Sequence, residues 1–493
     1  MIGVVIAIAC VVIIIILYGW SQFLLDRFYN MPPGPFPLPF IGNIRMLSKF
    51  RTRCECLSSL TEEYGNISTF YTGQTRMIVL NGPKEVHEGI VSQGKITSHR
   101  PIDFTPGFKG VPTGVLLSSG EKWQSLRRFS LRVLRDFGMG KQKILDNIHE
   151  EVGFLLDEWD QTAVNRPFDA QRLLQNSVSN VVSILVFGKR FEYGDPVFHE
   201  FMELVNDLVT NTFGVRFSQK VISMAPVMRF FIRNSRKEDF QKFQREVGKL
   251  LKKAVEEHRQ DFSSDFIRDF PDVYIQMEMT EDGIDIESFA NLSVDLFAAG
   301  TETTATLLNW TLLYLCLNPA IQKRCHDEID KVIDSNRLPD SKDRSRLVYI
   351  DAVLNEAMRV ATIVPTALFH CNGNDVVKIG GYDIPERSIL VYNVWRLHHD
   401  PQYWNDPNIF NPDRFIDEDG KLLTHSSHFM PFGVGPRICL GENLAKMEGF
   451  VFLVSLLQRF SFRLPEGCTV DMNKSVSGIT HAPPPFKLIT TRR

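Results

Sequence analysis

The segment Phe432-Gly433-Val434-Gly435-Pro436-Arg437-Ile438-Cys439-Leu440-Gly441 places one cysteine on a glycine-rich loop. Residues 442–458 follow with an apolar pattern typical of a helix, so Cys439 is expected at or just before a helix N-terminus. Unpaired backbone N–H groups and the helix dipole favour a thiolate at such a position. No second cysteine lies nearby. The segment therefore predicts a metal site that takes one soft ligand from the protein.

The residues around Cys439 favour a flat, partly anionic group as the bearer of that metal. Gly435 and Gly441 lack a Cβ atom and would let the backbone pass close to a planar partner. Arg437 offers a permanent positive charge to an anion. Haem iron with an axial cysteine is the leading case of this chemistry.

Three other interpretations of Cys439 have different requirements. A small buried residue in a loop is the simplest, because free cysteine often fills cores. A zinc site would need three or four Cys or His ligands at close spacing, and none flank this position. A Cys–His protease stays open, although its signature is not a Gly- and Arg-rich loop.

The ten residues resemble the haem-binding signature of the cytochrome P450 family, with Phe432, Gly435, Arg437, Cys439 and Gly441 in place. The resemblance implies that Cys439 binds the iron of haem b. It also implies that the other four residues contact the cofactor.

A second motif, Ala299-Gly300-Thr301-Glu302-Thr303-Thr304, lies inside a long apolar-periodic segment, 285–317, which Asn318-Pro319 ends. Glycine costs about 1 kcal/mol relative to alanine in a helix interior, and threonine hydroxyls can bond backbone carbonyls. The motif therefore predicts a local opening of the helix. For Gly300 alone, a notch where another helix crosses is the better interpretation.

This motif resembles the oxygen-activating segment of the same family, with Glu302 in the acidic position. The resemblance implies that Glu302 and Thr303 deliver the protons needed to cleave dioxygen, the co-substrate, in a dry pocket. Ala299 is then expected near the substrate.

Two further sets of residues fit supporting roles. Glu356 and Arg359 stand at i and i+3 among apolar neighbours, which favours a buried pair. Similarity adds Arg414 and implies that the three hold the loop around the thiolate. Similarity also assigns five residues to the haem propionates: Trp123, Arg127, Arg437, Arg100 and His370. A satisfied structural histidine remains the alternative for His370.

Arg128, Arg132 and Arg135 form a basic stripe on another face of the helix predicted at 122–135. Such a stripe is either solvated or, in a haem-thiolate enzyme, a docking surface for an acidic electron donor.

The N-terminus predicts a membrane anchor. Residues 1–25 carry no charge and are long enough to cross a bilayer. A cleaved signal peptide is the rival, but the basic start that it requires is missing. Positive charges follow the segment, which predicts a single-pass anchor with a cytoplasmic body. The resemblance to the family's microsomal members implies that the membrane is that of the endoplasmic reticulum. Prolines between 32 and 39 predict a stiff connector or a plain spacer.

Composition favours one globular catalytic unit. The chain has 493 residues, 44% hydrophobic, without a linker or repeat, and its net charge of −3 does not suggest a nucleic-acid partner. The expected organisation is an anchor at 1–25, a proline-rich hinge at 26–40 and a haem-thiolate domain at 41–493. Helices are expected at 122–135, 143–160, 170–187, 198–211, 237–260 and 285–317, and strands at 67–71, 76–80, 376–379 and 389–394. The fold class is therefore mainly α with a minor β region (α+β), and the resemblance implies the helix-rich triangular body of the family.

The resemblance implies a microsomal monooxygenase that inserts one oxygen atom of O2 into a small lipophilic substrate such as a xenobiotic, fatty acid or steroid. Electrons would come from NADPH through NADPH–cytochrome P450 reductase, with cytochrome b5 and membrane lipid as further partners. Matching positions suggest an apolar pocket, and aliphatic side chains that merely fill core are the alternative for each residue: Phe104, Phe108, Leu116, Leu117, Ala299, Val364, Leu368 and Ile479.

Two other functions keep the haem but change the chemistry. A reductase-independent enzyme would rearrange peroxides or dehydrate oximes, and a membrane-tethered haem sensor or carrier would catalyse nothing. The Glu302–Thr303 pair argues against both, because neither needs an acid beside a hydroxyl in a weakened helix.

Overall fold

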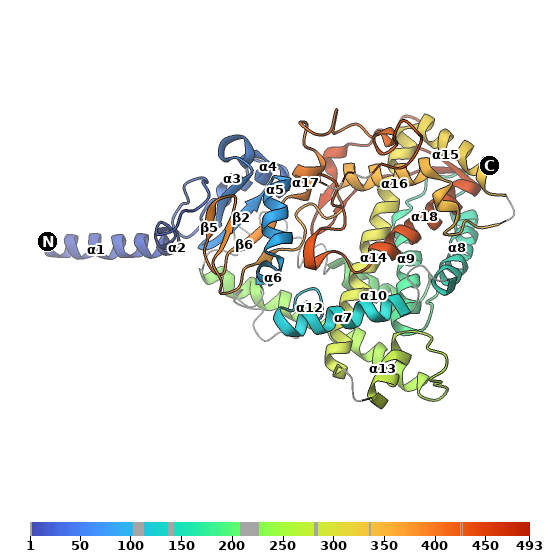
Figure 1. Cartoon of the computed structure of the whole chain (residues 1–493), viewed down its shortest axis with the longest axis horizontal. Coiled ribbons are helices and arrows are strands. Elements are labelled where there is room, and N and C mark those ends of the chain that lie inside the picture. Colours follow the sequence, from blue (N-terminus) through green and yellow to red (C-terminus); the bar gives the residue numbers. More distant parts are fainter. Residues whose placement is uncertain are drawn as a thin grey trace.

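The computed structural model describes residues 2–101, 113–136, 142–207, 226–280, 284–334, 337–423, 425 and 427–493. Helices dominate, and the main sheet lies on the side of the molecule from which the N-terminal helix projects (Figure 1), which confirms a mainly α fold with a minor β region. Two residues of the predicted pocket, Phe104 and Phe108, lie outside the described residues.

The predicted helices are present, and their described ends differ by a few residues except at the helix predicted from 237, which begins at Pro226. They are α7 (Gly120–Asp136), α8 (Gln142–Thr162), α9 (Gln171–Phe187), α10 (Pro196–Asp207), α12 (Pro226–His258) and α14 (Ile286–Leu317). The start of α14 is capped by the Asp285 carboxylate, which accepts a hydrogen bond from the Ser288 backbone N–H. Its end at Leu317 is set by Pro319, the first residue of α15 (Pro319–Val332).

Helix α14 is the central element of the core. It packs against α9 and α12, and also against α16 (Val348–Ala361) and α18 (Glu442–Arg459). Every residue of α16 from Tyr349 to Ala361 is buried. The remaining helical segments are α3 (Ile44–Leu47), α4 (Arg53–Tyr64), α5 (Pro83–Val86), η1 (His87–Ser92), α6 (Gly94–Thr97), α13 (Phe270–Thr280), η4 (Asp343–Ser345), α17 (Val394–His398), η5 (Pro412–Phe415), η6 (Gly435–Arg437) and η7 (Met472–Lys474).

The main sheet has the strand order β1-β2-β6-β3. Its strands are β1 (Ile67–Thr72), β2 (Thr75–Leu80), β3 (His370–Cys371) and β6 (Ile389–Tyr392). The predicted hairpin of β1 and β2 is confirmed, whereas the parallel pairing of β2 with β6 was not predicted. The two-stranded pairs are β4 (Val377–Ile379) with β5 (Tyr382–Ile384), β7 (Phe460–Arg463) with β10 (Ile489–Arg492), and β8 (Val476–Ser477) with β9 (His481–Ala482).

At the N-terminus, α1 (Ile2–Gly19) projects away from the body (Figure 1). Within the described residues it is the one helix long and apolar enough to cross a membrane. The next helix, α2 (Ser21–Asp26), is fastened to the sheet, because the buried Asp26 carboxylate pairs with Arg76 and accepts a 2.6 Å hydrogen bond from the Tyr71 hydroxyl.

The proline-rich segment lies along β1. The backbone N–H of Thr69 donates to the carbonyl of Pro33 at 2.8 Å, and the Thr69 hydroxyl donates to the carbonyl of Pro32. A Cβ atom on Gly34 would lie 2.0 Å from the Thr69 carbonyl oxygen, so only glycine permits this approach. The segment is thus bonded to the body over the first half of its predicted range.

Candidate functional site

Helix α14 has one exposed position in its middle. Among residues 288–316 only Ala299 is exposed, and its neighbours Gly300 and Thr303 are half-buried. Positions i and i+4 lie on one face of a helix, so Ala299 and Thr303 face the same open space. The Thr303 hydroxyl donates a 2.9 Å hydrogen bond to the Ala299 carbonyl, a bond that weakens helical continuity there.

Gly300 serves helix packing. A Cβ atom at this position would lie 2.7 Å from Cγ2 of Val182 on α9. The notch interpretation is therefore confirmed for Gly300. The predicted local opening of the helix is wrong, because α14 is unbroken from Ile286 to Leu317.

Cys439 lies two residues after η6 and three before α18, as the sequence predicts. Its backbone N–H donates to the Phe432 carbonyl at 3.0 Å, and its side chain is exposed. Although it borders open space, the thiol is deep enough in the fold for burial to raise its pKa, against hydrogen bonds from the backbone of Gly441 and Glu442. The backbone N–H groups at the start of α18 therefore favour the thiolate, as predicted, but burial outweighs them.

The two glycines have different roles. Gly435 has a φ of +74°, and a Cβ atom there would lie 2.3 Å from the Ile90 carbonyl oxygen, so the packing of η1 demands glycine. The contact with Ile90 is enough to explain Gly435, so the predicted close approach to a flat partner is not required. A Cβ atom on Gly441 would meet only the Cys439 sulfur, at 4.0 Å. The absence of a side chain at Gly441 therefore keeps the space beside the thiol clear.

Three arginines converge beside this loop. The Arg437 guanidinium lies 4.0 Å from the ring centre of Trp123, and that of Arg127 lies 6.0 Å from the same ring. Arg127 also donates a 2.9 Å hydrogen bond to the Ile438 carbonyl, next to Cys439. The residues of α7 predicted to contact the propionates are thus next to the cysteine loop.

Backbone carbonyls hold the guanidinium groups of Arg437 and Arg100. Arg437 donates to the carbonyls of Ser98, Val115 and Ser118 at 2.6–3.1 Å, and Arg100 to those of Leu116, Leu368 and Phe369 at 2.7–2.9 Å. Each guanidinium has five N–H donors, so each retains donors for another acceptor.

In the part of the chain that the structure describes, Arg100, Arg127 and Arg437 have no acidic counterpart. Within the described ranges, no carboxylate forms an ion pair with Arg100, Arg127 or Arg437. Burial, followed by repulsion from Arg100 and Arg127, lowers the pKa of Arg437 to about 8, and burial lowers that of Arg100 to about 10. A ligand with two carboxylates would relieve this repulsion. The two propionates of haem carry that charge.

His370 has a backbone partner. Its Nδ1 lies 3.0 Å from the carbonyl oxygen of Thr97, so the ring donates from Nδ1. Burial, with Arg100 and Arg437 adding repulsion, lowers the pKa of His370 far below its ordinary value. In the protein alone His370 is neutral, with Nε2 as an acceptor, which favours its structural interpretation.

Glu302 and Thr303 face different neighbours. The Glu302 carboxylate accepts hydrogen bonds from Gln175 on α9 at 2.8 Å and from Thr306 at 3.2 Å. It is 9% exposed, and burial raises its pKa to about 7. The acid therefore holds a proton near neutral pH, but it must turn away from Gln175 to reach Thr303.

Sequence reasoning missed Gln175, because its contact with Glu302 joins two helices. A signal did exist in the predicted helix 170–187. The stretch 175–183 contains six polar side chains, all buried: Gln175, Asn176, Ser177, Ser179, Asn180 and Ser183. Such a polar stripe in an apolar helix indicates a buried network.

The predicted charge network is present. Glu356 and Arg359 are both fully buried and form two hydrogen bonds of 2.7 and 2.8 Å. Arg414 contacts the same carboxylate at 3.4 Å, and the Asn411 backbone N–H donates to it at 2.9 Å. The pair on α16 therefore anchors the segment that contains Arg414.

This network continues toward the cysteine loop. Arg359 donates to the His398 carbonyl at 2.7 Å, and the His398 ring accepts a 3.0 Å bond from the backbone N–H of Met430. Met430 precedes Phe432 by two residues. The connection gives a physical route by which Glu356 and Arg359 stabilise the loop around Cys439.

The described residues of the predicted pocket are partly exposed, and two of them, Leu116 and Leu368, contact Arg100. The carbonyls of Leu116 and Leu368 both accept from Arg100, although the two residues are far apart in the sequence. The Leu116 backbone N–H also donates to the Asp295 carboxylate at 2.7 Å, one turn of α14 before Ala299. Leu117, Val364 and Ile479 are likewise half-buried.

The basic stripe is on the surface. Arg128, Arg132 and Arg135 are all exposed on α7, whereas Trp123 of the same helix is buried. The helix therefore presents one face to the cysteine loop and another to solvent.

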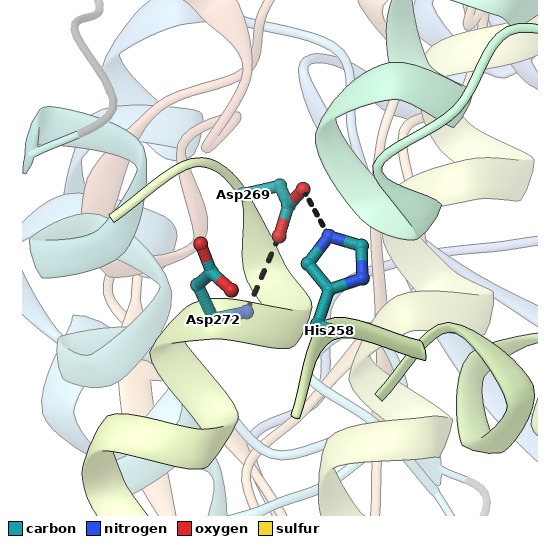
Figure 2. A group of neighbouring side chains, drawn as sticks. All are labelled: His258, Asp269 and Asp272. Atoms are coloured by element: carbon teal, nitrogen blue, oxygen red, sulfur yellow. Dashed lines mark hydrogen bonds and ion pairs between the residues drawn. The ribbon is translucent and has the colours of Figure 1, made fainter. Parts of the chain in front are cut away.

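A separate group of metal-type ligands joins α12 to α13. His258, Asp269 and Asp272 have ligand atoms within 4.8 Å of one another. In Figure 2, Asp269 contacts both the His258 ring, at 2.8 Å, and the Asp272 backbone N–H. The Asp272 carboxylate is occupied by Arg268, through two nitrogens at 2.7 and 2.9 Å. Since each ligand already has a protein partner, we interpret the group as a structural link between α12 and α13.

Comparison with known proteins gives a consistent result. A family model described as Cytochrome P450 matches residues 32–490. Cytochrome P450 2U1 of Homo sapiens is 33% identical, with 97% of this chain and 92% of the relative covered. Cytochrome P450 2B4 of Oryctolagus cuniculus is 35% identical (93% and 93%), as is Cytochrome P450 2E1 of Mesocricetus auratus (96% and 95%).

Proposed function

Because the chain belongs to the cytochrome P450 family, we propose that it inserts one atom of O2 into a small lipophilic substrate, with electrons from NADPH delivered by a membrane-bound reductase. It is a monooxygenase of xenobiotic or lipid substrates, with haem b as cofactor and O2 as co-substrate. The observation that carries the proposal is the exposed Cys439 thiol beside three buried or half-buried arginines that have no acidic partner among the described residues.

The site fits haem b in its donors and in its charge. Cys439 would bind the iron as a thiolate, and Arg100, Arg127 and Arg437 would hold the propionates, with the indole of Trp123 beside them. When bound, the haem supplies the oxygen-activating chemistry. Two propionates would also raise the proton affinity of His370, whose Nε2 could then donate.

The residues of α14 supply protons and exclude water. Thr303 places a hydroxyl on the open face of the helix, where it can orient a proton donor. Glu302 stores a proton behind it and releases it when the side chain leaves Gln175. Ala299 and the half-buried aliphatic residues keep the substrate side apolar, which favours lipophilic ligands.

The electron donor and the membrane are the proposed partners. Arg128, Arg132 and Arg135 would dock an acidic reductase, and cytochrome b5 could use the same surface. The helix α1 would anchor the chain in the endoplasmic reticulum membrane, with the body in the cytoplasm. Reversing Arg128 and Arg132 to Glu should slow reduction at low salt and matter less at high salt.

The test is turnover by the full chain in lipid vesicles with the reductase, NADPH and a panel of lipophilic compounds. We expect an oxygenated product that requires NADPH and O2, and its loss in Cys439→Ser. Product formed from a peroxide without NADPH would instead support the reductase-independent enzyme. Haem binding without any product across the panel would support a sensor or carrier.

A further inference from the structure

The last turn of α1 is hydrogen-bonded to the body of the molecule. The carbonyl of Tyr18 accepts a 2.8 Å hydrogen bond from the side-chain amide of Gln74, in the turn between β1 and β2. The Gly19 carbonyl accepts one from the Phe40 backbone N–H at 3.2 Å. A Cβ atom on Gly19 would lie 2.7 Å from the Phe40 ring, so the missing side chain permits this contact.

The next helix, α2, is attached to the sheet by the buried pair Asp26–Arg76. The two side chains are 3% and 5% exposed. Arg76 also donates a 2.8 Å hydrogen bond to the Ser388 hydroxyl, and Tyr71 donates to Asp26. Detaching α2 would remove the counterion of a buried guanidinium, which is costly.

The chain after α2 stays bonded to the sheet. The backbone N–H of Asp383 on β5 donates to the Asn30 carbonyl at 2.8 Å, and the Asn30 side chain donates to the Gly381 carbonyl at 3.2 Å. The Trp20 indole donates to the Pro37 carbonyl at 2.9 Å. Together with the bonds of the proline-rich segment to β1, these contacts connect α1 to the body at many points.

Exposed apolar side chains surround the point where α1 joins the body. Phe28 is 87% exposed. The Phe36 ring lies 5.6 Å from that of Trp20 and 5.1 Å from that of Phe23, so the proline-rich segment adjoins α2. We call six exposed side chains of these two segments the root patch: Leu24, Leu25, Phe28, Phe36, Leu38 and Ile41. An apolar surface of this kind marks an interaction site.

Continuity with α1 identifies a lipid bilayer as the occupant of the root patch. In the part of the chain that the structure describes, α1 is the one helix that could cross a bilayer, and the patch begins five residues after its end. Exposed cations lie on the same segments and on α3: Arg27, Arg45 and Lys49. Apolar side chains bordered by cations suit the region where acyl chains meet headgroup phosphates.

We propose that the body is joined rigidly to its membrane helix and rests on the bilayer through the root patch, with the Asp26–Arg76 pair fixing the joint. The inference rests on the membrane anchor proposed above. The direction of α1 then sets the tilt of the body relative to the membrane. A fixed tilt would hold the basic stripe of α7 at one height above the bilayer, where a membrane-bound electron donor can reach it.

The first test adds tryptophan to the full chain in phosphatidylcholine vesicles with or without bromine on the acyl chains, since bromine quenches indole emission on contact. We expect brominated vesicles to quench most of the emission added by Phe28→Trp and by Ile41→Trp. The control is Phe266→Trp, at a 63% exposed position before α13, which lies away from α1 (Figure 1). Its added emission should persist. Equal quenching at all three positions, or none at 28 and 41, would overturn the contact with lipid.

The second test measures the rigidity of the joint by linear dichroism of the haem absorption in aligned bilayers. A body held at one tilt gives polarised absorption. We expect the double variant Asp26→Asn, Gln74→Ala to lose most of this dichroism and Asp327→Asn, in an exposed ion pair of α15, to keep it. Gln74→Ala alone changes an exposed side chain and should lower the dichroism in part, which keeps the test usable if the double variant binds less haem. Equal dichroism in the natural chain and both Gln74→Ala variants would refute the rigid joint.

Flotation of the vesicles separates this inference from the anchor on which it rests. If the natural chain does not float with them, the membrane anchor fails and the inference fails with it. If the chain floats but the added tryptophans at 28 and 41 are not quenched, the anchor stands and the root patch is wrong.

Discussion

At the scale of the residue, burial decides the chemistry of this molecule. It raises the pKa of Cys439 and of Glu302, and it lowers that of Arg437. Sequence identifies these residue types and their spacing, but burial depends on neighbours that are distant in the chain. This explains why the arginines and Cys439 were predicted, while Gln175 and the direction of the thiol pKa shift were not.

Replacing Glu356 by Gln should prevent stable haem incorporation. The change leaves the fully buried Arg359 without its charge partner, and breaking a buried pair costs about 3–5 kcal/mol. Haem content and urea unfolding measure the effect. The exposed pair Lys323–Asp327 is the control, and Asp327→Asn should leave both unchanged. A Glu356→Gln protein with a full haem complement would contradict the role of the network.

The raised pKa of Glu302 predicts a pH-dependent stability. A buried acid with a pKa of about 7, against 4.5 ordinarily, favours the folded state while it is protonated. Its stabilising effect is therefore present below about pH 4.5 and is lost as the pH rises through 7. Between pH 5 and 8 the natural chain should lose up to about 3 kcal/mol that Glu302→Gln does not lose. Urea unfolding of both proteins at each pH measures this difference. If the free energies of unfolding of the two proteins depend on pH in the same way, the raised pKa of Glu302 is contradicted.

At the scale of the element, periodicity located most helices and strands. The predicted helix 285–317 and the hairpin of β1 and β2 agree with α14 and with the observed strands. The parallel pairing of β2 with β6 could not be predicted, since the two strands are more than 300 residues apart. The contact of α14 with α9, which positions Glu302, has the same long-range origin.

The fit of α9 against α14 can be tested at Gly300. Gly300→Ala adds a Cβ atom 2.7 Å from Val182. Overpacking should destabilise the fold by about 1–3 kcal/mol, and the higher helix propensity of alanine should offset part of this loss. Val182→Ala in the same chain should recover most of the loss. A double-mutant cycle by urea unfolding measures the coupling between the two positions. Additive effects would mean that the two side chains do not interact.

At the scale of the whole molecule, one body carries a projecting apolar helix (Figure 1). The family and this apolar helix were both predictable, because the first rests on contiguous motifs and the second on composition. The attachment of residues 20–43 to the sheet was not, since it depends on the pairing of Asp26 with Arg76 and on backbone contacts of the proline segment.

Truncation should show where the anchor ends. Removal of residues 2–19 should leave haem content and thermal unfolding of the body unchanged, because α1 is almost entirely exposed. The point variant Asp26→Asn should destabilise the body by about 3 kcal/mol, because Arg76 loses its buried partner. Equal unfolding temperatures for Asp26→Asn and the natural chain would show that α2 belongs to the anchor.

The central claim is that Cys439 binds haem iron as a thiolate, and the absorption spectrum of the reduced, carbon-monoxide-bound protein tests it most directly. The account predicts a Soret band shifted far to the red in the natural chain and its loss in Cys439→Ser. A Soret band at the position typical of histidine-ligated haem, or a red-shifted band that survives in Cys439→Ser, would contradict it.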